Sequence, residues 1–115
     1  MLSYLDEEDL RARITPDSFR RGYGPNAKES LEELLGELPI IRAQGWATQD
    51  EELAFGLRSV AAPVRNAGGQ VIAGANIAVQ ARDWSAQRVV RELRPQIAQA
   101  CHGISGLLGY SGDQP

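Results

Sequence analysis

The sequence predicts an α+β fold in which an antiparallel sheet of about three strands packs against helices, including a long C-terminal helix. Two apolar runs, Leu57–Val64 and Val71–Val79, are joined by a turn-rich link with two adjacent glycines, as neighbouring antiparallel strands often are. Apolar residues then recur at helical spacing between Ser85 and Gly109. A further stretch of helical periodicity, Ala27–Gln44, precedes the strands.

Helices are predicted ahead of the sheet. The segment Ser3–Ala12 has acidic residues near its start, where they complement the helix dipole, and Thr15–Asp17 ends it. Pro39 lies inside the window Ala27–Gln44 and predicts either a bend or a stop followed by a short turn. Gly45 is expected to end this helix and lead into a strand. The apolar stripe of the second helix consists of Leu31, Leu34, Leu35 and Leu38.

The predicted hairpin brings a hydroxyl and an amide into an otherwise apolar surface. Because side chains alternate along a strand, Leu57 and Ser59 share one face, and Asn76 and Ala78 share another. If Ser59 and Asn76 point the same way, they form a small polar patch that suits an organic ligand held in place without being transformed. The alternative is that both side chains only satisfy nearby backbone groups.

The C-terminal helix has the clearest periodicity. Ser85 is its expected N-cap and Gly109 its expected terminator. Pro95 removes a backbone donor inside the helix, which predicts a kink near Arg91–Arg94. The face expected to pack across the sheet carries Val89, Leu93, Ile97, Cys101, Ile104 and Leu108.

Length, charge and cysteine content limit the classes of protein to which the chain can belong. A chain of 115 residues allows one domain with a modest core, and the net charge of −3 offers no basic face for nucleic acid. Cys101 is the sole cysteine, which excludes an internal disulfide and fits a reducing compartment. Without a candidate membrane span or signal peptide, we expect a cytoplasmic location and no membrane partner.

The candidates for catalysis have simpler explanations. In the carboxylate run Asp50–Glu52, only Asp50 and Glu52 could cooperate, and a solvated acidic loop is the favoured reading. Cys101 and His102 are adjacent on a helix, so their side chains point about 100° apart, which spoils a nucleophile and base pair. A single histidine excludes a metal site built from several imidazoles. We therefore predict no catalytic residue, no metal and no cofactor.

Several short motifs occur in a specific order. GWA is followed by QDEE, then by GLRSVAAPVRNAGGQVIAGANIAV, and finally by the helix SAQRVVRELRPQIAQACHGISGLLG. Over nearly all 115 residues this order resembles the effector-binding domain of the IclR family of bacterial transcription regulators. NIAVQA is most similar to regulators of aromatic-acid catabolism, of the protocatechuate and β-ketoadipate kind. The motifs thus point to a sensing domain within a regulator.

The resemblance has implications for domain organisation. It implies a GAF-like fold in which residues 1–115 are the C-terminal part of an effector-binding domain. It also implies self-association, as a homodimer or tetramer. DNA would be bound only through an N-terminal winged helix-turn-helix, which is expected to be missing before Met1.

The resemblance also implies a small-molecule cavity on one side of the sheet. The Ser59 hydroxyl and the Asn76 amide could donate charge-assisted hydrogen bonds to an effector carboxylate. Trp46 could stack on an aromatic effector, although core packing is the alternative. Gln49 stands where several relatives place an acid, and Asp50 is the expected substitute. Carried over by motif position, the effector-binding residues are Gln49, Asp50, Leu57, Ser59, Asn76 and Ala78.

Two other classes of function stay open at this point. An enzyme would have to use Asp50 or Glu52 in general acid/base chemistry. A stand-alone module would instead use an incomplete sheet edge to pair with another chain, since exposed strand edges invite association.

Overall fold

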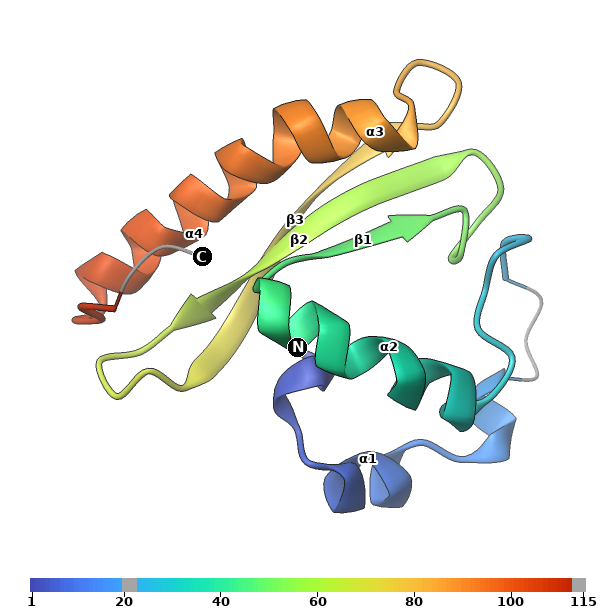
Figure 1. Ribbon diagram of the computed structural model, residues 1–115, viewed down its shortest axis with the longest axis horizontal. Coiled ribbons are helices and arrows are strands. Elements are labelled where there is room, and N and C mark those ends of the chain that lie inside the picture. The colour runs from blue at the N-terminus through green and yellow to red at the C-terminus, as the bar shows by residue number, and fades with distance from the viewer. Residues whose placement is uncertain (20–22, 113–115) are drawn as a thin grey trace.

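A three-stranded antiparallel sheet organises the computed structural model, which describes residues 1–19 and 23–112. Its strands are β1 (Ala47–Asp50), β2 (Leu57–Arg65) and β3 (Val71–Gln80), with β2 in the centre. Figure 1 shows the long C-terminal helix lying along one side of this sheet and the N-terminal helices on the other side. The predicted α+β class and strand number are therefore confirmed for the described residues.

The link between β2 and β3 is built by one asparagine side chain. The Asn66 Oδ1 atom accepts hydrogen bonds from the backbone N–H groups of Gly68 and Gln70, both at 3.0 Å. Gly69 follows with a φ of +80°, a left-handed conformation that glycine adopts without strain. The strand register shifts at Val64/Arg65, where an irregularity ends the regular ladder.

One face of the sheet forms the core with the C-terminal helix. This helical segment comprises α3 (Ala86–Arg88), a π-helical turn η3 (Val89–Leu93) and α4 (Arg94–Leu107). Burying a side chain of valine, leucine or isoleucine contributes about 1.5–3 kcal/mol, so this layer dominates the stability of the fold. The buried cluster consists of Val60, Ala62, Val64, Val89, Leu93, Ile97 and Cys101.

The π turn η3 lies where Pro95 predicted an irregularity. The backbone N–H of Arg94 donates to the carbonyl of Val89, five residues earlier, instead of to the residue four back. Pro95 then occupies the second position of α4, where its missing N–H leaves no interior hydrogen bond broken. The π turn thus overlaps Arg91–Arg94, the place of the predicted kink, and the kink itself stays a prediction.

The predicted packing stripe is correct in its first four members and wrong in its last two. Ile104 and Leu108 are 45% and 46% exposed, whereas Ser105 is only 2% exposed. Spacing of four residues continues from Cys101 to Ser105, so the buried face ends on a serine. Its hydroxyl donates to the Cys101 carbonyl and accepts from the Arg65 N–H, both at 2.8 Å, which explains why a polar residue is buried there.

The N-terminal helices begin later than predicted because side chains cap them. The first segment divides into a 3₁₀ turn η1 (Leu2–Tyr4) and helix α1 (Glu7–Arg13), because the Asp6 carboxylate accepts from the N–H of Asp9 at 2.8 Å. A second 3₁₀ turn, η2 (Pro16–Phe19), follows.

Helix α2 (Leu31–Gln44) starts after its N-cap, Ser30, and not at Ala27. It continues through Pro39, so of the two alternatives the stop is wrong. Gly45, at a φ of +80°, ends the helix and leads directly into β1, as predicted.

Candidate functional site

The sheet face that points away from α4 carries an open cavity of about 350 Å³. This volume lies at the small end of the range of about 300–1,000 Å³ that is typical of small-molecule sites. Gln49 pairs with Ser59 across β1 and β2, and Ala61 pairs with Asn76 across β2 and β3. The cavity is lined by Met1, Ala47, Thr48, Gln49, Ser59, Ala61, Gly74, Ala75 and Asn76.

Ser59 and Asn76 share this face, which is the condition on which the expected polar patch depended. Ser59 is directly opposite Ala78, and Asn76 lies two residues further along the same side of β3. Neither side chain makes a hydrogen bond to another residue within 1–19 and 23–112. The alternative in which both merely satisfy backbone groups is therefore not observed, and their donors are available to a ligand.

Gln49 is engaged by the protein itself. Its side-chain nitrogen donates to the Leu57 carbonyl at 3.2 Å, and its oxygen accepts from the backbone N–H groups of Glu52 and Leu53 at 3.0 and 3.4 Å. The amide thereby holds the loop between β1 and β2 while its stem faces the cavity. Anything that bonded to this amide would compete with the loop.

The other candidate positions fall into two groups. The strand register places Leu57 and Ala78 on the same face as the cavity, but neither residue lines it. Asp50 and Trp46 are on the opposite face and are not brought to the cavity. Trp46 packs against the core and lies under the guanidinium of Arg94, 5.6 Å from the ring centroid, in agreement with the core alternative.

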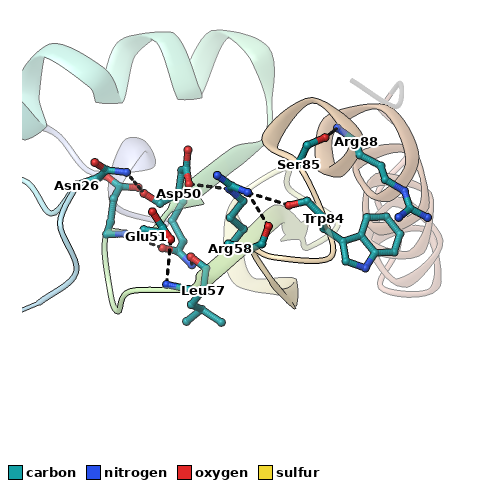
Figure 2. Close-up of polar contacts among 12 residues, drawn as sticks. Asn26, Asp50, Glu51, Leu57, Arg58, Trp84, Ser85 and Arg88 are labelled. Atoms are coloured by element: carbon teal, nitrogen blue, oxygen red, sulfur yellow. Dashed lines mark hydrogen bonds and ion pairs between the residues drawn. The ribbon is translucent and has the colours of Figure 1, made fainter.

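Asp50 pairs with a cation on the helix-facing side of the sheet. Its Oδ1 accepts from the Nε of Arg58 at 2.7 Å (Figure 2). The same guanidinium donates through Nη1 to the carbonyls of Ala81 and Trp84, at 3.0 and 2.9 Å. Asp50 is therefore committed to an internal contact, which no local sequence pattern indicates because the partner lies on the next strand.

The loop after β1 is held by the segment Gly24–Lys28, which we call the strap. The strap's Asn26 side-chain nitrogen donates to the Asp50 carbonyl at 2.7 Å, and the Gly24 N–H donates to the Glu52 carbonyl at 3.0 Å. Lys28 Nζ pairs with Glu52 at 2.7 Å and with Glu37 at 3.4 Å. The hydrogen bond with Glu52 is the main cause of a raised pKa for Lys28.

The carboxylate run does not assemble an acid/base pair. Asp50 is bonded to Arg58, and Glu52 is bonded to Lys28, so each acid has its own cation. Glu51 has a φ of +56°, which is rare for a residue with a side chain, and its carboxylate accepts from the Gly56 N–H at 3.0 Å. These contacts give the acids of the loop a structural role.

Other chemistry has few candidates in the described part of the chain. Among residues 1–19 and 23–112, no group of three histidine, cysteine, aspartate or glutamate side chains is placed to hold a metal ion. The Cys101 thiol is 1% exposed, and burial raises its pKa above the ordinary value. In the same residues, no helix combines the length and apolarity needed to cross a membrane.

The chain is similar to a known protein family and to individual transcription regulators. The family described as bacterial transcriptional regulator IclR C-terminal matches residues 1–106. The Pca regulon regulatory protein of Pseudomonas putida is 35% identical over 107 residues, which cover 90% of this chain and 33% of that protein. The transcriptional regulator KdgR of Dickeya chrysanthemi is 32% identical over 110 residues, covering 96% of this chain and 35% of that protein. The chain thus spans about a third of the length of these relatives.

Solved structures show the same fold. The C-terminal domain of Escherichia coli KdgR matches with a TM-score of 0.81 and 30% identity, over 95% of this chain and 65% of that one. The inducer-binding domain of a PobR double mutant from Acinetobacter, in complex with 3-hydroxybenzoic acid, matches with a TM-score of 0.80. It covers 92% of this chain and 60% of that one, but at 23% identity the likeness is one of fold alone. Both the fold and the predicted likeness to a Pca-type regulator are confirmed, and the chain belongs to the IclR family of bacterial transcriptional regulators, in which it matches part of the C-terminal domain.

Proposed function

We propose that residues 1–115 are the C-terminal part of an effector-binding domain that senses a small organic carboxylate. The observation that carries this proposal is the pair of side chains without internal partners, the Ser59 hydroxyl and the Asn76 amide, on one wall of the cavity of about 350 Å³. Ligand pockets typically combine mostly apolar walls with a few hydrogen-bonding groups that fix the ligand's orientation. This cavity has that composition.

The lining offers hydrogen-bond donors that a carboxylate can use. Hydroxyl and amide donors form stronger hydrogen bonds to an ionised acceptor than to a neutral one. Small side chains, Ala47 and Ala61 among them, leave room for an aliphatic or aromatic body. An aromatic acid is what the resemblance of NIAVQA to regulators of aromatic-acid catabolism implies, and a Pca regulon regulator is among the relatives.

We propose that Gln49 reports occupancy of the cavity. A ligand changes a protein only if it binds one arrangement better than another. The Gln49 amide bonds the loop at Leu57, Glu52 and Leu53, so a carboxylate that recruited this amide would loosen the loop. Leu57 and Ala78 would line the approach to the cavity. Asp50 and Trp46 would support the site from the other face.

The proposal treats the domain as non-catalytic. Asp50 and Glu52, the residues that an acid/base enzyme would need, are bonded to different cations, and neither lines the cavity. The relatives are regulators in name, which fits binding without turnover. Release of a chemically altered ligand after incubation would count against this view.

The parent regulator would bind DNA through a separate N-terminal module and act in the cytoplasm, where bacterial DNA lies. Self-association, as a homodimer or tetramer, would then set the spacing of those modules. Strand β3 lies at one side of the described sheet, and a strand at a sheet edge presents unpaired backbone groups to another chain. Sedimentation without ligand measures this association.

Thermal unfolding with a panel of acids tests the sensing function. The panel contains benzoate, 3-hydroxybenzoate and pyruvate, each at high concentration. Ligand at about 100 times its Kd stabilises a folded protein by about 2.7 kcal/mol, which raises Tm by several degrees for a domain of this size. We expect at least one acid to raise Tm in the wild type and in Gln80→Leu, which alters an exposed polar residue on the same face. The rise should vanish in the double variant Ser59→Ala with Asn76→Leu, and no stabilisation by any acid would argue strongly against the function.

A further inference from the structure

Arg58 connects three segments that are distant in the sequence. From the centre of the sheet its guanidinium donates to the Asp50 carboxylate on β1 at 2.7 Å, and to the carbonyls of Ala81 and Trp84 in the turn after β3 (Figure 2). The Arg58 side chain is 21% exposed, so these hydrogen bonds are partly shielded from water. Charge-assisted bonds in such a setting are stronger than neutral ones.

The residues beside this contact belong to the cavity. Asp50 and Arg58 are register partners, and the adjacent pair in the same two strands is Gln49 and Ser59. Because successive side chains point to opposite faces, the cavity pair and the ion pair lie back to back through the same backbone. A shift of β1 that moved Gln49 would therefore also move Asp50 relative to Arg58.

The carbonyls held by Arg58 belong to the turn that starts the C-terminal helix. Ser85 caps this helix by accepting from the Arg88 N–H at 3.1 Å (Figure 2). The Arg88 guanidinium lies 3.8 Å from the centroid of the Trp84 ring and donates to the Asp83 carbonyl at 3.3 Å. The turn and the first helical residues are thus bound together as one unit, which Arg58 attaches to the sheet.

We propose that Arg58 is the positioning residue through which the state of the cavity is transmitted to the start of the C-terminal helix. Its biological meaning rests on the proposed sensing function, whereas the mechanical link is a property of the fold. The hydrogen bond to Asp50 makes the position of the Arg58 side chain depend on the position of β1. The hydrogen bonds to the carbonyls of Ala81 and Trp84 then make the position of the turn depend on Arg58. The planar fork of a guanidinium is suited to this task, because a lysine ammonium cannot serve the same directions at once.

If Arg58 only stabilised the fold, it would have the same contacts but would not transmit a movement of β1 to the turn. Amide hydrogen exchange separates these two roles when it is read at the turn and helix start, where the N–H groups of Ala81, Asp83, Trp84 and Val89 are bonded within the protein. The perturbation on the cavity side is Gln49→Ala, which removes the amide that holds the loop. No ligand is present, so the outcome does not depend on the sensing function.

The experiment is a double-mutant cycle. We expect Gln49→Ala to speed exchange at those amides by at least about fivefold in the wild-type background, as coupling of moderate strength requires. The same change is expected in an Arg82→Lys background, because Arg82 is in the same turn but its side chain is 80% exposed. In an Arg58→Lys background the effect of Gln49→Ala should disappear. An equal effect in all three backgrounds, or none in the wild type, overturns the proposal.

Asp50→Asn covers the case in which Arg58→Lys does not fold. This substitution keeps the shape of the side chain and removes the charge, so the effect of Gln49→Ala should be reduced, and an undiminished effect overturns the proposal. A second arm adds 3-hydroxybenzoate. We expect Arg58→Lys to leave its Kd within about threefold of the wild type, while ligand-dependent protection of the helix start is lost. Failure of the wild type to bind any acid counts against the sensing function, and the ligand-free cycle then still decides the role of Arg58.

Discussion

Gln49 and Ser59 are register partners across β1 and β2, yet only the Gln49 side chain is bonded within the described part of the protein. The glutamine amide holds the loop that follows β1, and the serine hydroxyl is open to the cavity beside it. On one wall of the cavity, the Ser59 hydroxyl can thus donate to a ligand directly. The Gln49 amide beside it could bond to a ligand only by giving up its hydrogen bonds to the loop. The side chain proposed to bind the ligand is therefore next to the side chain proposed to release the loop when the ligand binds.

Removal of the Gln49 amide should release the loop. We expect Gln49→Ala to lower the free energy of unfolding by about 1 kcal/mol, the usual net contribution of a hydrogen bond. Exchange of the Glu52 and Leu53 amides should rise, because both lose their acceptor. Gln80→Ala, at an exposed position on β3, is the matched control and should change neither quantity. Unchanged exchange at Glu52 in the Gln49 variant would show that the loop is held by other contacts.

Gly24 is required where the strap meets the loop. A Cβ atom at this position would overlap the backbone carbonyl of Glu51, which cannot move without shifting the loop. We expect Gly24→Ala to lower the free energy of unfolding by about 2 kcal/mol, as overpacking does. Gly36→Ala is the control, because nothing lies within 4 Å of an added Cβ there, and an exposed helical alanine should stabilise by about 0.5–1 kcal/mol. Chemical denaturation measures both, and equal stabilities would contradict the close approach.

Ser105 should be more important for stability than its size indicates. Its hydroxyl satisfies the Arg65 N–H at the irregular end of β2, and the residue is 2% exposed. Ser105→Ala leaves that N–H without a partner in a buried position, for which we expect a loss of about 1–3 kcal/mol. Ser111→Ala, at an exposed serine near the end of the described chain, should have no measurable effect. A neutral Ser105→Ala variant would mean that water reaches Arg65.

The buried thiol should make the protein sensitive to alkali. Burial raises the pKa of Cys101, so the folded state binds the thiol proton more tightly than the unfolded state. The resulting stability is complete below the unfolded pKa and is lost as the pH rises through the folded pKa. We expect the free energy of unfolding to fall more steeply above about pH 9 in the wild type than in Cys101→Ala. Parallel pH profiles for the two proteins would rule out this contribution.

The features that could be predicted from the sequence are those with a local signal. The apolar runs Leu57–Val64 and Val71–Val79, with glycines between them, identify the hairpin, whereas the register that places Ser59 and Asn76 on one face is known only from the structure. Gly45 and Gly109 mark helix ends because each adopts a positive φ, and Ser85 marks a helix start because its hydroxyl accepts from the N–H three residues later.

The features that could not be predicted depend on pairing between distant residues. Asp50 reads as a loop acid until β1 is known to pair with β2, which brings Arg58 beside it. The strap has no periodicity, and its contacts with the loop span 24 residues of sequence. Ser105 departs from the apolar pattern, and its partner at Arg65 is 40 residues away.

The π turn at Val89–Leu93 restricts which insertions and deletions this helix can tolerate during evolution. A π turn holds about one residue more than an α-helical turn, so loss of one residue from it would restore regular α-helical geometry and leave the later side chains close to their present orientation. Ile97 and Cys101 would then still face the sheet, whereas loss of one residue between Ile97 and Cys101 would rotate Cys101 by about 100° away from it. Homologous chains that keep this core should therefore vary in length at this turn and not in the part of the helix that follows Pro95.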